Sequence, residues 1–157
     1  MRQTKREITD LIQIEAVIQK AEVCRLALWD DGYPYIVPLN FGYADRTLYF
    51  HCALEGKKIE LIRENSRAGF ELESVAQIVP HAQNACAWSA KYQSVIGRGT
   101  VAVLDRPEEK RRALDVIMAH YTGEKRSWEF PDEHLGKMLA LRLDIETMTG
   151  KQSKEFL

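Results

Sequence analysis

The amino-acid sequence predicts a mainly β protein, an antiparallel barrel with peripheral helices. Several segments alternate apolar and polar residues with the period of two that is typical of strands. The expected elements follow the order helix, three strands, helix, several strands, helix, strand, which does not fit a doubly wound parallel sheet. Gly97 and Gly99 interrupt the longest strand pattern, where a closing barrel would need a bend.

Changes of hydrophobic period define the first two elements. Asp10 can cap a helix that runs to about residue 22, and its apolar positions keep the spacing of one helical face: Ile14, Val17, Ile18 and Ala21. The next segment changes to a period of two, because Cys24, Leu26 and Leu28 alternate with their neighbours. Residues 24–29 are therefore expected to form a strand.

Turn residues separate this strand from the next two. Asp31-Gly32 is a strong signal for a tight turn, so residues 33–41 should form the following strand. Pro34 and Pro38 interrupt it, and proline is normally confined to edges or bulges, so we expect an edge strand. Asp45-Arg46 then turns the chain into a third strand at residues 48–51. We expect these three strands to pair as an antiparallel meander.

The second half of the chain contains two helices and three further strands. We expect a helix at residues 55–64, strands at residues 68–72, 92–104 and 138–145, and a helix that begins at Pro107. The apolar stripe of this second helix is formed by Leu114, Ile117, Met118 and Tyr121. Residues 74–89 show no clear pattern, and residues 122–136 read as a polar connection.

Composition and charge limit the classes of function. With 157 residues of which 45% are hydrophobic, the chain can bury a core and is expected to form a single domain, residues 1–157. The 22 Lys and Arg residues against 23 Asp and Glu residues leave a formal charge of -1. No bulk field therefore favours nucleic acid or an anionic membrane, and any phosphate site must be local.

Cysteine usage and the N-terminal segment predict a cytoplasmic protein. The three cysteines, Cys24, Cys52 and Cys86, are too few for a disulfide framework, and reduced thiols are typical of the cytoplasm. The first ten residues are polar and contain no apolar region of the kind that signal peptides need. No segment approaches the roughly 18 consecutive apolar residues of a spanning helix, so we expect no membrane partner.

The strongest local motif runs from His51 to Lys58, where a strand ends, a turn follows and a helix begins with two lysines. Helix N-termini attract anions because their first N–H groups are unpaired and the helix dipole is positive there. Lys57 and Lys58 suit a phosphate, although a solvated basic turn would have the same sequence. His51 is either a polar group of a site or a structural histidine.

Other catalytic motifs are not found in the sequence. The four histidines, His51, His81, His120 and His134, lack the spacings that bring metal ligands together, so no metal site is expected. The chain also lacks a G-x-S-x-G elbow, a P-loop and a G-x-G-x-x-G that opens a helix.

Three motifs in order carry a resemblance to a known family. Residues 35–43 (YIVPLNFGY), 48–51 (LYFH) and 55–58 (EGKK) resemble the consecutive motifs of nitroimidazole-resistance (Nim)-like proteins, which are related to pyridoxamine 5'-phosphate oxidases. Residues 88–97 (WSAKYQSVIG) and 148–151 (MTGK) also match, so the resemblance covers nearly the whole chain. It implies an FMN-binding split β-barrel and a homodimer with the cofactor at the interface.

The resemblance also implies roles for individual residues. His51 flanks the flavin ring and is the candidate catalytic residue, and Lys57 and Lys58 hold the FMN phosphate. Ser94 supplies a hydroxyl contact, whereas Gln93 stands where the family has a basic residue. The cofactor-binding set implied by the resemblance is Val37, Pro38, Leu39, Asn40, His51, Cys52, Gly56, Lys57, Lys58 and Ser94.

The function implied is that of an FMN-dependent oxidoreductase that reduces a small oxidised or nitroaromatic substrate. NAD(P)H is the expected electron donor, although no binding motif for it is visible. Two alternatives stay open: a flavin-binding carrier or sensor without turnover, and a haem-binding split barrel in which a histidine ligates iron.

Overall fold

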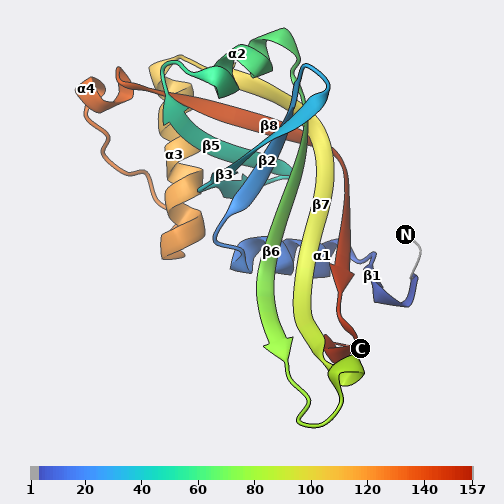
Figure 1. Cartoon of the computed structure of the whole chain (residues 1–157). Helices are drawn as coiled ribbons and strands as arrows, with labels where there is room; N and C mark the ends of the chain where they lie inside the picture. The colour runs from blue at the N-terminus through green and yellow to red at the C-terminus, as the bar shows by residue number, and fades with distance from the viewer. Residues whose placement is uncertain (1–3, 157) are drawn as a thin grey trace.

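The protein folds as an antiparallel split β-barrel with few helices, as the sequence predicts (Figure 1). The computed structural model describes residues 4–156. Its eight-stranded sheet has the order β3-β2-β6-β7-β8-β5-β4, and β1 pairs with β8. No helix within residues 4–156 is long and apolar enough to cross a membrane.

The elements occur in the following order along the chain. The strands are β1 (Glu7–Ile8), β2 (Cys24–Asp30), β3 (Tyr33–Leu39), β4 (Gly42–Ala44), β5 (Thr47–Ala53), β6 (Arg67–Val79), β7 (Ser89–Leu104) and β8 (Met138–Gln152). The α-helices are α1 (Leu11–Lys20), α2 (Lys57–Glu64), α3 (Pro107–Thr122) and α4 (Asp132–Leu135). Short 3-10 turns lie at Thr4–Arg6, Ala85–Ala87 and Lys154–Phe156.

Local signals place the first helix and hairpin correctly. The Asp10 side chain caps α1 by accepting a hydrogen bond from the Ile12 N–H at 3.0 Å. The helix ends at Lys20, two residues earlier than expected, because Ala21 is already extended. Asp31 and Gly32 both have positive φ, of 44° and 92°, which is the backbone of the tight hairpin that joins β2 to β3. The proline-containing β3 is an edge strand, as expected.

The predicted meander of three strands is wrong. β5 pairs with β4 and β8, whereas β3 pairs with β2 at the opposite end of the strand order. Alternation determines which face of a strand is buried but does not determine its partner. In the structure, the fully buried Leu48 and Phe50 lie opposite Leu143 and Leu141 of β8, so the apolar faces of two distant segments are joined.

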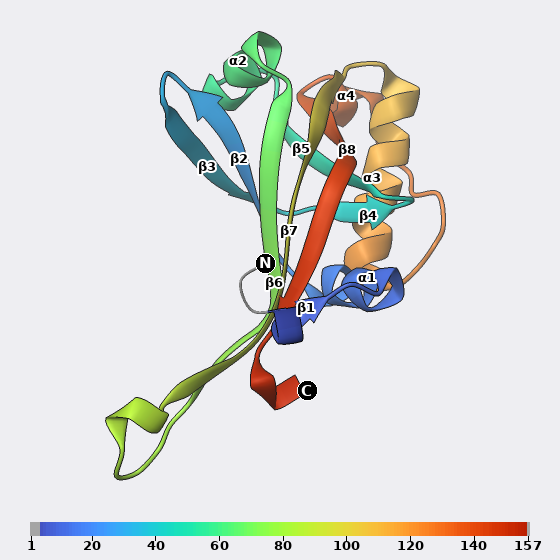
Figure 2. The same cartoon turned by 90° about the vertical axis from the view of Figure 1, so that its right-hand side faces the viewer.

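Residues 74–89, unassigned from the sequence, belong largely to a projecting hairpin. β6 continues to Val79 and β7 begins at Ser89, and together they form an arm that extends beyond the barrel (Figure 2). β8 is also longer than predicted and continues to Gln152. The arm was missed because none of its side chains are fully buried, so it has no apolar face for alternation to reveal.

Two clusters of buried side chains organise the helices around the barrel. The interior cluster includes Ile14 and Ile18 of α1 and Ile59 and Ile62 of α2, so these two helices pack against opposite ends of the barrel (Figure 1). A smaller cluster lies beneath α3, where Ile117 packs with residues of β5, β7 and β8. Among residues 4–156, no helix covers the outer face of β3, β2, β6 and β7 (Figure 1).

The bend predicted in β7 is present at its glycines. The register between β7 and β8 shifts between Arg98 and Gly99, which marks a β-bulge. A β-carbon added at Gly99 would lie 2.0 Å from the Asp144 carbonyl oxygen, far closer than any real contact. Backbone of β8 thus occupies the space that any other residue would need.

We predict that Gly99→Ala lowers the free energy of unfolding by about 2 kcal/mol, because β8 must move to accommodate the methyl group. Gly69→Ala is the matched control on β6, since its β-carbon would meet Ala27 and Gly97 only at 3.8 Å. This control should stay within about 0.5 kcal/mol of the native protein in urea unfolding. Equal stabilities of the two variants would contradict the close approach at Gly99.

Candidate cofactor site at the start of α2

The turn between β5 and α2 presents an open helix N-terminus. β5 ends at Ala53, and Gly56 precedes the first residue of α2 with a φ of 127°, a conformation that favours glycine. No side chain caps the helix, and a β-carbon at Gly56 would meet nothing within 4 Å. The first N–H groups of α2 are therefore accessible, and the helix dipole makes this end attractive to an anion.

The two lysines at this N-terminus have different surroundings. Lys57 forms an ion pair with Asp30 at the end of β2, and its ammonium lies 5.6 Å from the centre of the Tyr35 ring. The hydrogen bond to Asp30 raises the pKa of Lys57. Lys58 is half-buried and forms no ion pair within the described residues. Of the two lysines, Lys58 is therefore the one whose charge is available to a ligand.

His51 and Cys52 point in opposite directions at the end of β5. Cys52 packs against the interior cluster, and burial raises the pKa of its thiol, although the positive charge of Lys58 opposes that rise. His51 is exposed and lies opposite Ala140 of β8. The sequence left open whether His51 is structural, and its exposure shows that it is not part of the core.

The segment Val37, Pro38, Leu39 and Asn40 forms the end of an edge strand. Val37 and Leu39 pack against the interior cluster, whereas Pro38 lies on the exposed outer side. Because β3 has a partner on one side only, main-chain groups along its other edge are available to a ligand. The Asn40 side chain follows the strand and donates a hydrogen bond to the Tyr121 hydroxyl at 3.2 Å.

The structure places five of the ten expected residues, His51, Cys52, Gly56, Lys57 and Lys58, together between the end of β5 and the start of α2. The contacts of Lys57 with Asp30 and Tyr35 hold the α2 N-terminus, with His51 and Cys52 just before it, against the β2–β3 hairpin. Ser94 lies elsewhere, opposite Glu73 and Lys151. Six residues of β6 separate Glu73 from the strand start beside α2, which is about 20 Å along the strand. Within one chain, Ser94 is therefore remote from the lysines.

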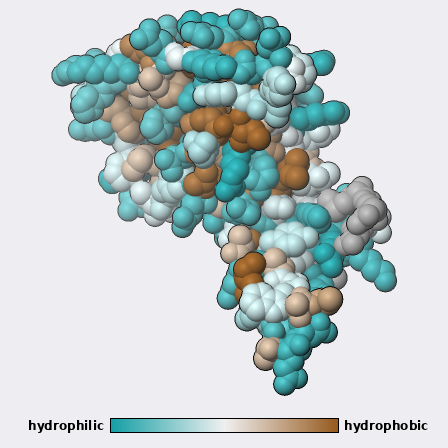
Figure 3. Space-filling view, in the orientation of Figure 1, coloured by the Kyte–Doolittle hydropathy of each residue, from teal (hydrophilic) through white to brown (hydrophobic). Residues whose placement is uncertain are grey.

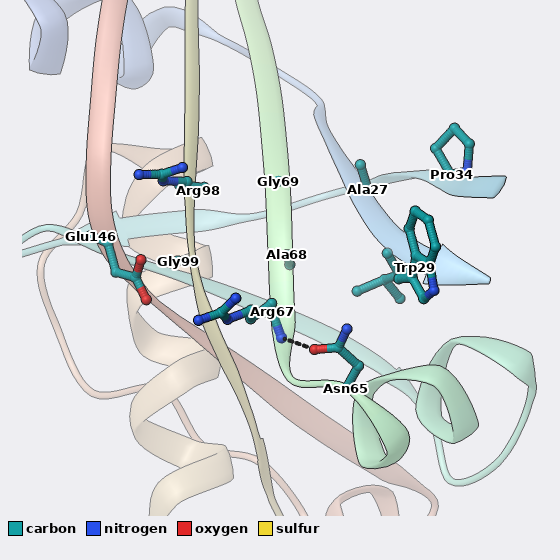
Figure 4. Close-up of a pocket in the computed structure, with 11 residues that line it drawn as sticks. Ala27, Trp29, Pro34, Asn65, Arg67, Ala68, Gly69, Arg98, Gly99 and Glu146 are labelled. Carbon is teal, nitrogen blue, oxygen red and sulfur yellow. Dashed lines mark hydrogen bonds between the residues drawn. The ribbon is translucent and has the colours of Figure 1, made fainter. Parts of the chain in front are cut away.

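Sequence reasoning missed a depression on the outer face of the sheet. It measures about 710 Å³, and Ala27 and Gly69 form part of its floor (Figure 4). Trp29 lies on one side, and Arg67 and Arg98 lie toward the other, near Glu146 (Figure 4). Alternation along β2, β6 and β7 could have placed these side chains on one face, but only the strand order shows that the three strands are neighbours.

A second feature missed from the sequence is the role of the last turn of α3. Tyr121 was expected in the apolar stripe of that helix, but its hydroxyl instead contacts Asn40, Phe41 and Glu22. Its neighbour His120 lies 2.8 Å from the Ala21 carbonyl oxygen through Nε2. No local pattern signals these contacts, because they join segments about 80 to 100 residues apart in sequence.

Comparisons with known proteins agree with this architecture. The family model described as pyridoxamine 5'-phosphate oxidase matches residues 10–152. A candidate 5-nitroimidazole antibiotic resistance protein from Bacteroides thetaiotaomicron has a solved structure with 36% sequence identity and a TM-score of 0.80, covering 92% of this chain and 85% of that chain. No curated protein matches the sequence.

More distant solved structures share the fold. An FAD-binding protein from Mesorhizobium loti is 26% identical with a TM-score of 0.68, covering 95% of this chain and 98% of that one. An FAD- and haem-binding protein from Mycobacterium smegmatis is 23% identical with a TM-score of 0.80, covering 95% and 74%. Because the family model spans most of the chain and the Bacteroides protein is 36% identical over 92% of it, this protein belongs to the pyridoxamine 5'-phosphate oxidase family.

Proposed function

We propose that the protein binds FMN at the start of α2 and acts as a reductase of small oxidised or nitroaromatic compounds. The observation that carries the proposal is the uncapped N-terminus of α2, where the half-buried Lys58, which has no ion pair among residues 4–156, lies beside accessible N–H groups. This arrangement suits a phosphate. The 36% identity to a candidate 5-nitroimidazole antibiotic resistance protein supports the substrate class.

Two parts of the chain would bind the two ends of the cofactor, the start of α2 its phosphate and the free edge of β3 its ring. Lys58 and the first N–H groups of α2 would hold the phosphate, with Lys57 free to join them if it leaves Asp30. The free edge of β3 at Val37, Pro38, Leu39 and Asn40 would lie along the ring. When bound, the flavin supplies hydride or electron transfer, while the protein supplies position and electrostatics.

His51 is the residue that we assign to the reaction. Its imidazole is exposed at the end of β5, six residues before Lys57. This stretch of chain is long enough to separate the two side chains by roughly the length of a ribityl linker, at about 3.3 Å per extended residue. The imidazole would donate a hydrogen bond or a proton where negative charge develops during reduction.

Two basic residues near the C-terminus do not form a site for pyridoxamine phosphate, which favours a reductase over an oxidase. Arg142 forms an ion pair with Asp144 at 3.0 Å. Lys151 lies 5.6 Å from the centre of the Tyr92 ring, near the arm. Gln93, where the family has a basic residue, donates a hydrogen bond to Gln152 at 3.2 Å. We therefore propose that a substrate other than pyridoxamine phosphate is reduced, with NAD(P)H as donor.

We also propose that the protein is a homodimer with the cofactor at the subunit boundary. The helix-free outer face of β3, β2 and β7 exposes Trp29, Ile36 and Ile96 to 58%, 58% and 57%. In Figure 3 apolar side chains gather at the centre of this face and again on the arm. Such a patch marks an interaction surface. A second copy packed there could bring its own Ser94 toward the cofactor.

The function is tested on the purified protein and its His51→Ala variant. The native protein should show the two broad absorption bands of flavin and oxidise NAD(P)H in the presence of a nitroaromatic compound. His51→Ala should lower turnover or shift the flavin potential far more than it weakens FMN binding, because the imidazole contributes most when the ring gains charge. Its thermal stability should be unchanged, since His51 is exposed.

Two outcomes would contradict this function, and a third would contradict the role of His51. A sharp Soret band in place of flavin absorption would indicate the haem-binding alternative. Bound flavin without any nicotinamide oxidation would indicate a carrier or sensor. Normal kinetics and a normal flavin potential in His51→Ala would exclude the catalytic role of His51.

The phosphate site is tested by single lysine variants. Lys58→Ala should raise the dissociation constant of FMN at least about tenfold, because a charge-assisted hydrogen bond is worth about 1.5 to 3 kcal/mol. Lys57→Ala should have a smaller effect, since Asp30 already pairs with Lys57. The affinity for riboflavin, which lacks the phosphate, should change little in either variant.

Lys137→Ala is the matched control, because Lys137 is also exposed and paired, but with Glu133 of α4. This variant should bind FMN as the native protein does. Fluorescence titration measures all these affinities. Unchanged FMN affinity in a variant that lacks both Lys57 and Lys58 would remove the phosphate assignment.

The dimer is tested by sedimentation of the FMN-saturated protein. Ile96→Glu places a second acidic side chain beside Glu71 on the outer face and should convert the dimer to a monomer with weakened FMN binding. Ile12→Glu is the control, because Ile12 is 76% exposed on α1, away from this face. The proposal fails if the native protein sediments as an FMN-saturated monomer.

A further inference from the structure

The Tyr121 hydroxyl joins three groups near the end of β3. Its oxygen lies 2.7 Å from the Glu22 carbonyl oxygen, 3.1 Å from the Phe41 nitrogen and 3.2 Å from Asn40 Nδ2. Glu22 precedes β2, and Asn40 and Phe41 connect β3 to β4. A single side chain from α3 thus ties together the connections at one end of the hairpin.

The chemistry of these groups determines the orientation of the Asn40 amide. A tyrosine hydroxyl has one proton to donate and two lone pairs to accept with. Its proton must go to the Glu22 carbonyl, which can only accept, and one lone pair takes the Phe41 N–H, which can only donate. The remaining lone pair needs a donor, so the amino group of Asn40, and not its oxygen, must face Tyr121.

This arrangement is anchored in the core. Phe41 is fully buried, and its ring centre lies 4.3 Å from that of His120. His120 Nε2 lies 2.8 Å from the Ala21 carbonyl oxygen, so both residues of the last turn of α3 hold the same two connections. The Asn40 side chain itself is exposed, and its Oδ1 forms no hydrogen bond within residues 4–156.

We propose that Tyr121 is a positioning residue that presents Asn40 Oδ1 as an acceptor to the N3–H group of the bound flavin ring. The inference rests on the proposed function, in which the free edge of β3 lies along the ring, and it adds that the ring turns its polar pyrimidine edge toward Asn40. On that edge the oxidised ring has one donor, N3–H, between two carbonyl groups. An amide whose amino group is already engaged offers that donor its oxygen. Because FMN and FAD share this ring, the inference does not depend on the phosphate site.

The test compares FMN with N3-methyl-FMN, which cannot donate from N3. In fluorescence titrations the native protein should bind FMN at least about tenfold more tightly than the methylated analogue, because the analogue leaves the amide oxygen unpaired. Tyr121→Phe should reduce this ratio to less than about threefold by weakening FMN binding, because Asn40 is then free to turn. Asn40→Ala should reduce the ratio likewise without disturbing any buried group.

Tyr43→Phe is the matched control for loss of a tyrosine hydroxyl. The Tyr43 hydroxyl donates to Glu15 at 2.7 Å, so this variant also loses a tertiary hydrogen bond. Burial raises the pKa of this hydroxyl to about 12. It should lose stability as Tyr121→Phe does, yet keep the native ratio between the two flavins. A purely structural role for Tyr121 would instead leave the ratio unchanged in Tyr121→Phe.

The outcomes separate the two proposals. If the native protein binds FMN but does not discriminate against the methylated analogue, the inference about Asn40 and Tyr121 is overturned while the proposed function stands. If the native protein binds neither flavin, both are overturned. If Tyr121→Phe does not fold, the ratio in Asn40→Ala decides, and a native ratio in that variant overturns the inference.

Discussion

The close approach of β7 and β8 at Gly97 and Gly99 is the constraint on which the rest of the structure depends. β7 pairs with β6 on one side and β8 on the other along most of its length, so its bend is shared by three strands. A side chain at Gly99 would occupy the position of the Asp144 carbonyl group. The bend curls the sheet, and the contact of Lys57 with the β2–β3 hairpin shows that segments from its two ends meet.

The contact between α2 and the β2–β3 hairpin also determines the electrostatics of the candidate site. Lys57 forms an ion pair with Asp30, whereas the adjacent Lys58 remains unpaired within the described residues. The positive charge of Lys58 opposes the rise in the pKa of Cys52. A chain with a formal charge of -1 can thus present a local positive site, because only one of two neighbouring lysines is neutralised by an ion pair among the described residues. Lys57 is paired with the β2–β3 hairpin, and Lys58 is available to a ligand beside the open helix N-terminus.

α3 links parts of the molecule that lie far apart in sequence. Ile117 in its middle packs over β5 and β8, while His120 and Tyr121 in its last turn hold the connections that flank β2 and β3. The conformation of the edge strand therefore depends on a helix about 80 residues away. The opposite, helix-free side of the sheet carries exposed apolar residues and the projecting arm, which is the surface that we propose for a second copy.

The sequence by itself determined the features that arise from local stereochemistry. Asp10 caps α1 and Asp31-Gly32 forms the hairpin turn, because each depends on backbone angles or hydrogen bonds of adjacent residues. The motif from His51 to Lys58 was also correctly predicted as a strand end, turn and helix start. The order of three motifs was enough to indicate the family that the comparisons show.

Only the tertiary structure decided which elements lie next to one another. β5 pairs with β8 instead of β3, because a period of two specifies a buried face but not the strand beside it. The same limit concealed the pairing of Lys57 with Asp30 and the contacts of Tyr121 with Asn40, and it left the depression between β2, β6 and β7 unpredicted. These contacts exist because barrel closure and helix packing join distant segments, and no local pattern in the chain records which segments will meet.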